Sequence, residues 1–221
     1  MSIQDDIDDI LEENGTFESR ETVSNELIGK YSEKLPKLLT VFWKQQGFGA
    51  WGGSLFRLCN PDDFEGLLSQ IFHADDDFSH KDCHIYGYSA FGQLLIWSER
   101  HWVTQVDLVN GRVSCPVLID PSKAKNADIH MSTSLSVHPD SLDSYDDNDK
   151  KLFTRAVKKY GRPEPRQAFG FFPALAMGGA PNLENIQIVP ALEHFLFLAQ
   201  LQQFKLVDYL AQPPRVVREI G

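Results

Sequence analysis

The sequence has few of the features that mark secreted, membrane or zinc-binding proteins. Its 221 residues include three cysteines, which are widely spaced and form no CxxC pair. This argues against both a disulfide framework and a thiolate zinc site. No run of about 18 uncharged apolar residues is present, and the first residues, MSIQDDIDDILEENG, are acidic where a signal peptide needs a basic and then an apolar segment. We therefore expect a cytoplasmic protein without a membrane partner.

Basic residues are also scarce. The chain has 21 Lys and Arg against 31 Asp and Glu, which gives a formal net charge of -10. A field of this sign repels phosphate backbones and attracts cationic partners. Direct binding to nucleic acid is therefore not expected, although charge alone names no partner.

Motifs for a nucleophile or a nucleotide are missing as well. Residues 87–92 read GYSAFG, and Phe91 stands where a GxSxG nucleophile elbow has its second glycine. Lys30, in IGKYS, lacks both the earlier glycine and the directly following hydroxyl residue of a phosphate-binding loop. We predict no coherent active site and no cofactor, which favours binding over catalysis.

What the sequence does contain is the periodicity of an α+β protein. Residues 84–91, 93–99 and 101–118 are β-type sequence. In the last segment Trp102, Thr104, Val106 and Leu108 share one face with period 2, and Asn110-Gly111 is a strong hairpin signal. These segments predict an antiparallel central sheet of three or four strands. Helical spacing predicts flanking helices at 5–13, on both sides of Leu35-Pro36, from Pro61 to about 72, over 152–160 and after Pro190.

The polar residues 122–149 are predicted to form a long loop or boundary. They suggest two closely packed parts, residues 1–120 and 121–221.

One window, residues 72–84 with the sequence FHADDDFSHKDCH, is dense in side chains that bind metals. On a helix, His73 with Asp77 and His80 with His84 would be four residues apart and able to share an ion. The aspartates follow a helix end, however, and His84 begins a strand, so a continuous helix is not expected. We predict an acidic loop and no metal site. A metal-dependent hydrolase that uses His73, Asp77, His80 and His84 is the enzyme alternative.

Two blocks of sequence carry a family resemblance. They are residues 31–68, YSEKLPKLLTVFWKQQGFGAWGGSLFRLCNPDDFEGLL, and residues 160–201, YGRPEPRQAFGFFPALAMGGAPNLENIQIVPALEHFLFLAQL. Together they resemble the GAD-like domain family with its C-terminal extension, which is found in bacterial immunity proteins that neutralise type VI secretion DNase effectors. The matching positions, such as Trp43, Pro61, Pro173 and Gly179, are mostly apolar residues, glycines and prolines, and they define a fold more than a site.

The resemblance implies a GAD-like domain in residues 1–120 and a helical immunity-type extension in residues 121–221. It also implies a non-enzymatic protein whose partner is a cognate toxin, a basic nuclease domain. A regulatory adaptor for another cytoplasmic protein is a further alternative, and the oligomeric state is left open.

Acidic clusters and aromatic residues expected at the surface are the candidate contacts for such a toxin. A basic DNA-binding groove attracts an acidic surface, and tight inhibitors depend on a few aromatic or charged anchors. The acidic segments are 5–13, 62–63, 75–77 and 140–149. The expected toxin-binding residues are Trp51, Asp62, Asp63, Asp75, Asp76, Asp77, Asp143, Tyr145, Asp146 and Asp147.

Overall fold

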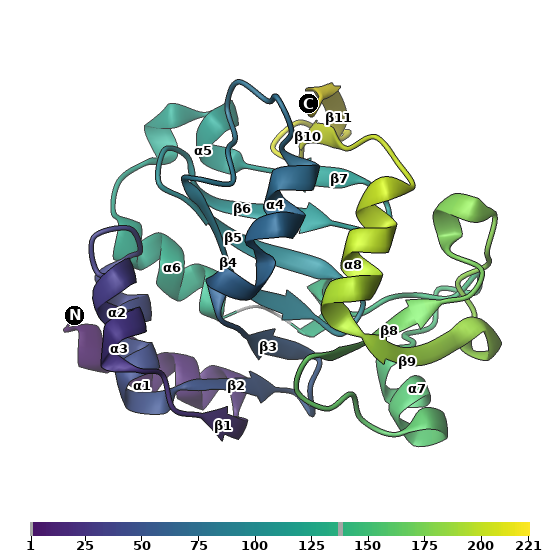
Figure 1. Ribbon diagram of the computed structural model, residues 1–221, viewed down its shortest axis with the longest axis horizontal. Helices are drawn as coiled ribbons and strands as arrows, with labels where there is room; N and C mark the ends of the chain where they lie inside the picture. The colour runs from purple at the N-terminus through teal and green to yellow at the C-terminus, as the bar shows by residue number, and fades with distance from the viewer. Residues whose placement is uncertain (1, 137–138) are drawn as a thin grey trace.

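A large twisted sheet runs through the middle of the molecule (Figure 1). The computed structural model describes residues 2–136 and 139–221, and in these residues the sheet has nine strands in the order β1-β2-β3-β4-β5-β6-β7-β10-β11. Neighbouring strands are antiparallel except β7 and β10, which are parallel. The strands are β1 (Glu18–Glu21), β2 (Phe48–Trp51), β3 (Phe56–Leu58), β4 (Cys83–Ser89), β5 (Gln93–Ser98), β6 (Trp102–Asp107), β7 (Arg112–Ser114), β10 (Lys205–Asp208) and β11 (Arg215–Glu219).

Helices cover both faces of this sheet. Helices α4 and α8 lie next to each other on one face, and α1, α3 and α6 pack against the other (Figure 1). This confirms the predicted α+β class, with an antiparallel central sheet flanked by helices. The helices are α1 (Ile3–Asn14), α2 (Asn25–Tyr31), α3 (Lys37–Gln46), α4 (Glu65–Ile71), α5 (Pro116–Ile119), α6 (Ala127–Leu135), α7 (Phe153–Tyr160) and α8 (Ala191–Gln200).

The central strands are buried on both sides because each face of the sheet has its own core. On β4, Tyr86 belongs to the core beneath α1, α3 and α6, whereas Ile85 belongs to the core beneath α4 and α8. On β5, Leu95 and Ile96 divide in the same way. Adjacent strand residues point to opposite faces, so apolar residues in a row are what a doubly covered strand requires.

Local signals place α3 and α4 as predicted. Asn60 accepts the Asp62 N–H at 3.1 Å, and Pro61 opens the 3-10 turn η1 (Pro61–Phe64) that leads into α4. Gly47 ends α3 with a φ of 80°. A Cβ at Gly47 would lie 2.3 Å from the carbonyl oxygen of Glu21 on β1, so glycine lets the two strands approach.

The sheet extends beyond the three or four strands that the sequence predicts. Strands β1 and β2 at one edge, and β10 and β11 at the other, were not expected. Lys205 of β10 pairs with Arg112 of β7, far away in the sequence, and such pairing leaves no local signature. The predicted loop at 122–149 was also partly wrong, since it contains α6. Asn126 caps this helix by accepting the Ile129 N–H, and Met131 and Leu135 bury its inner side.

The C-terminal half adds a small subdomain beside the sheet. A separate two-stranded sheet pairs β8 (Gln167–Phe171) with β9 (Ile186–Pro190), and α7 packs against β9 (Figure 1). Strands β10 and β11 belong to the large sheet, so this sheet contains strands from both sides of the predicted division at residues 120/121. The division into two parts stays a prediction. Within the described ranges, no helix has both the length and the apolar character needed to cross a bilayer.

Candidate functional site

The acidic window 72–84 is a structural connection in which Asp75 is internal. The Asp75 side chain is 1% exposed, and its carboxylate accepts bonds from both terminal nitrogens of Arg218, at 2.6 and 3.0 Å. It also accepts the N–H groups of Asp77, Phe78 and Gly221. Burial alone would raise the pKa of Asp75, but these hydrogen bonds outweigh it and hold the pKa at about 2. The expectation that Asp75 faces a partner is therefore wrong.

The other acidic residues of this window differ in whether their carboxylates form ion pairs. Asp77 also binds Arg218, at 2.7 Å, and Asp82 binds Arg100 at 2.7 Å. Asp76 is exposed and contributes only its backbone carbonyl, which accepts from Arg100. Asp76 is thus the one member of the predicted trio 75–77 whose carboxylate faces solvent without an ion pair among the described residues.

The enzyme alternative drew on His73, Asp77, His80 and His84. His84 lies on β4, where its Nε2 is 2.8 Å from Glu99 and its ring packs edge-on against Tyr31. Burial lowers the pKa of His84 more than Glu99 raises it. Within residues 2–136 and 139–221, no three His, Cys, Asp or Glu side chains gather as metal ligands do.

Asp62 and Asp63 follow the cap of η1. Asp62 accepts bonds from Lys30 at 2.7 Å and from the Tyr31 hydroxyl at 2.5 Å. Its burial would raise the pKa of the carboxyl, but these two donors lower it below its ordinary value. Asp63 is exposed and stands at the edge of a cleft described below.

The second acidic segment is organised around the start of α7. Asp143 accepts the Phe153 N–H at 2.9 Å, so it satisfies a free donor of that helix, and burial raises the pKa of its carboxyl. Asp146 is buried and binds Arg155 at 2.5 Å. Tyr145, 39% exposed, and Asp147 lie at the surface as expected.

Trp51, the other aromatic residue expected at the surface, is in the core. It is 3% exposed and packs against the rings of Phe17, Phe42 and Phe56. The glycines around it suggested an exposed turn, but Trp51 is the last residue of β2 and its side chain points beneath the sheet. The prediction that Trp51 is an exposed anchor is wrong.

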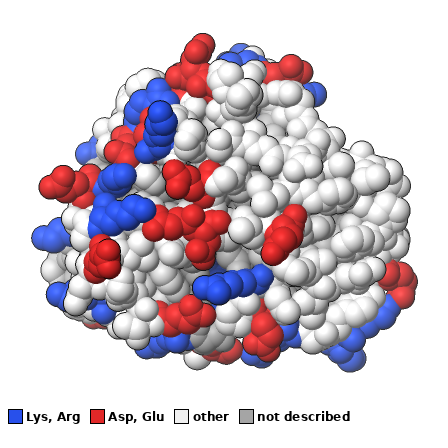
Figure 2. Space-filling view, viewed as in Figure 1, with Lys and Arg blue, Asp and Glu red and all other residues white. Residues whose placement is uncertain are grey.

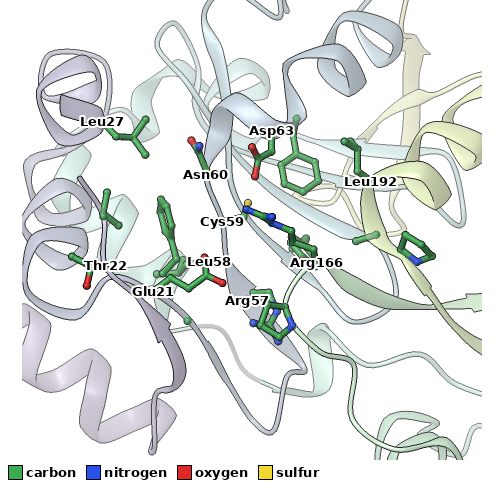
Figure 3. A pocket seen from close by; sticks show the side chains of 18 of the residues that line it. Glu21, Thr22, Leu27, Arg57, Leu58, Cys59, Asn60, Asp63, Arg166 and Leu192 are labelled. Carbon is green, nitrogen blue, oxygen red and sulfur yellow. The ribbon is translucent and has the colours of Figure 1, made fainter. Parts of the chain in front are cut away.

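The described residues enclose a cleft of about 640 Å³, here called the Arg57 cleft. It lies between α2, β3 and η1 on one side and the start of α8 with residues 165–166 on the other (Figure 3). Leu27 and Leu192 face it from opposite sides, and Arg57, Cys59 and Arg166 lie at its centre (Figure 3). The cleft therefore combines apolar walls with two cations.

Strand alternation places Arg57 in this cleft. Its neighbours Phe56 and Leu58 point to the opposite face and join the core beneath α3. Arg57 pairs across the strands with Tyr88 and is 6% exposed. Its Nη2 donates to Ser54 Oγ at 3.1 Å and to the Pro163 carbonyl at 3.4 Å. Burial raises the pKa values of both Cys59 and Tyr88, so these neighbours are neutral at pH 7.

The rim of the cleft is mainly acidic and exposed. Glu21, Asp63 and Glu193 surround the opening, and all three are exposed. Arg166 is exposed as well, and its carbonyl accepts the Ala191 N–H at 2.8 Å, which fixes residues 165–166 against the first turn of α8. In Figure 2, charged side chains gather over the α2–α4 side, while the surface over α8 and the β8–β9 sheet is mostly uncharged.

Sequence reasoning missed Arg57 and Arg166. The available signal was a cation inside an otherwise apolar strand, in SLFRLC, where a buried position needs a structural or binding reason. The partner segment, residues 165–166, is more than 100 positions away, and its approach to Arg57 follows from the fold alone.

Two family models match the chain, one in its N-terminal part and one in its C-terminal part. Residues 5–110 match the GAD-like domain family, and residues 137–202 match the family described as T6SS immunity protein Tdi1, C-terminal. The chain therefore belongs to the GAD-like type VI immunity proteins that carry this C-terminal domain.

A solved structure supports the same architecture. The crystal structure of Atu4351 from Agrobacterium tumefaciens superposes with a TM-score of 0.91, at 28% sequence identity and over 96% of each chain. No curated protein matches the chain.

Proposed function

We propose that this immunity protein binds a cognate type VI secretion toxin, a DNase, and neutralises it by covering its active or DNA-binding surface. The observation that carries the proposal is the C-terminal match to the Tdi1 immunity family over residues 137–202. The proposal places the protein in the cytoplasm and gives it a protein partner, with no catalysis and no nucleic-acid binding of its own.

Electrostatics supports a basic partner. A nuclease that binds DNA presents a positive surface, and an inhibitor with a net charge of -10 is steered toward it before contact. The acids that remain exposed, including Asp63, Asp76 and Asp147, can supply this long-range attraction. A stable inhibitory complex needs an interface of about 1,600 Å² in total, which a surface of 10868 Å² readily provides.

Co-expression tests the proposal. A candidate toxin domain encoded by a neighbouring gene is induced in bacteria with and without this protein, and plasmid integrity and viability are followed. We expect the toxin alone to degrade plasmid DNA and the pair to leave it intact, with both proteins recovered as a complex by affinity capture. If DNA is degraded equally in both cultures and no complex is recovered, the proposed function is wrong.

A further inference from the structure

We propose that the Arg57 cleft receives a carboxylate side chain of the toxin, held by the guanidinium groups of Arg57 and Arg166. This rests on the proposed function and names the surface and the chemistry by which the toxin is recognised. The cleft lies where the two family matches meet, since Arg57 is in the GAD-like part and Arg166 is in the C-terminal part.

Arg57 differs from the other buried charges. Among the described residues, the buried carboxylates Asp146 and Asp208 each bind an arginine, and buried His84 is bonded to Glu99. Within the described part of the chain, Arg57 has no carboxylate within 4.0 Å and donates only to a hydroxyl and a carbonyl, both through Nη2. Burying a cation without a counter-ion costs desolvation free energy, so binding a carboxylate to the Arg57 guanidinium would be favourable.

A single carboxylate fits better than a phosphate chain. An arginine fork binds a carboxylate through two parallel hydrogen bonds, and a second cation nearby strengthens the pair. The exposed acids Glu21, Asp63 and Glu193 at the rim repel a polyanion. They attract a basic surface that projects one acidic side chain. Leu27 and Leu192 offer apolar contact to the aliphatic part of that side chain (Figure 3).

The volume and the opening of the cleft favour a protein segment. About 640 Å³ is far more than one carboxylate needs, and the remainder accommodates the residues that flank it. The acidic rim then meets the positive surface of the nuclease while the carboxylate reaches the floor. The acidic rim attracts positive charge and the cationic floor attracts negative charge. A basic partner surface that carries one carboxylate satisfies both.

The test measures toxin affinity by titration calorimetry with four variants. We expect Arg57→Met to weaken binding by about 30-fold or more, because the partner carboxylate would be buried without its counter-ion. Arg57→Lys keeps the charge and should recover part of the loss. Arg166→Gln changes an exposed residue without threatening the fold, and it should weaken binding less. Arg112→Gln, an exposed arginine on β7 away from the cleft, is the matched control and should bind like the wild type.

Three results would overturn the inference. One is wild-type affinity in both Arg57→Met and Arg166→Gln. Another is an equal loss in Arg112→Gln, which would indicate general electrostatics. The third is saturation of the cleft by free glutarate with unchanged toxin affinity, which would make it a site for small acids. In each case wild-type protein still binds the toxin, so the proposed function stands. If wild-type protein fails to bind, the proposed function itself fails.

Discussion

Asp75 and Arg57 are both buried charges, and they differ in what surrounds them. Asp75 lies in an acidic part of the sequence, yet its carboxylate is enclosed by Arg218 and three backbone N–H groups. Arg57 lies in an apolar strand and has no carboxylate within 4.0 Å among the described residues. The density of charged residues in a sequence therefore says little about where a partner binds, and what matters is which charges the fold leaves without a counter-ion.

Trp51 and Tyr145 should differ most in their effect on stability. Both were expected at the surface, but Trp51 is buried and Tyr145 is exposed. Trp51→Ala should lower the free energy of unfolding by about 3–5 kcal/mol, because it leaves a cavity among Phe17, Phe42 and Phe56. Tyr145→Ala should change it by less than about 0.5 kcal/mol. Urea denaturation followed by fluorescence and circular dichroism measures both. Equal effects of the two variants would contradict the core assignment of Trp51.

Removing the cation that encloses Asp75 should have the next largest effect. Arg218→Met leaves a carboxylate of 1% exposure without its partner, and we expect a loss of about 3 kcal/mol in unfolding free energy. Arg112→Met, on an exposed part of β7, serves as the matched control and should be nearly neutral. A neutral result for Arg218→Met in the same urea experiment would show that the ion pair does not anchor β11.

The same site predicts a pH dependence. The pKa of Asp75 is about 2 in the folded protein, below the ordinary value of about 3.9 that it takes in the unfolded chain. A lowered folded pKa gives stability that is present above pH 4 and is lost as the pH falls toward 2. The Asp75→Asn variant lacks this group, so thermal unfolding should show a smaller drop across that window. A drop as steep as that of the wild type would assign the effect to other carboxyls.

The smallest effect is expected from exposed acids. Asp76→Lys should slow association with the toxin by less than about tenfold at about 20 mM salt, since it removes part of the steering field. At about 200 mM salt the difference should shrink, because the charge is screened. Stopped-flow association with the toxin measures both rates. A loss that persists at high salt would instead place Asp76 in direct contact.

Most elements of the fold could be predicted because their signals are local. The caps at Asn60 and Gly47, the apolar β-type segments of β4 and β5, and the period-2 alternation of β6 required only neighbouring residues. The outer strands β10 and β11 could not be predicted, since β10 is stabilised by pairing with β7, far earlier in the chain, and β11 in turn pairs with β10. Periodicity does not report such pairing.

The candidate site was harder to predict for the same reason. Composition correctly indicated exposed acids at Asp63, Asp76 and Asp147. It could not show that Asp75 would form an ion pair with Arg218, because Arg218 is 143 positions from Asp75 in the chain. Nor could it show that Arg57 would have no carboxylate partner among the described residues. Pairing of charges is a property of the tertiary structure.

The most direct test compares stability and toxin affinity in two variants. Arg218→Met should reduce unfolding free energy and leave the toxin Kd within about twofold of wild type under folding conditions, whereas Arg57→Met should raise the Kd by about 30-fold or more. Calorimetric titration of both variants against the same toxin preparation gives the answer. A large loss of affinity in Arg218→Met together with wild-type affinity in Arg57→Met would contradict the account.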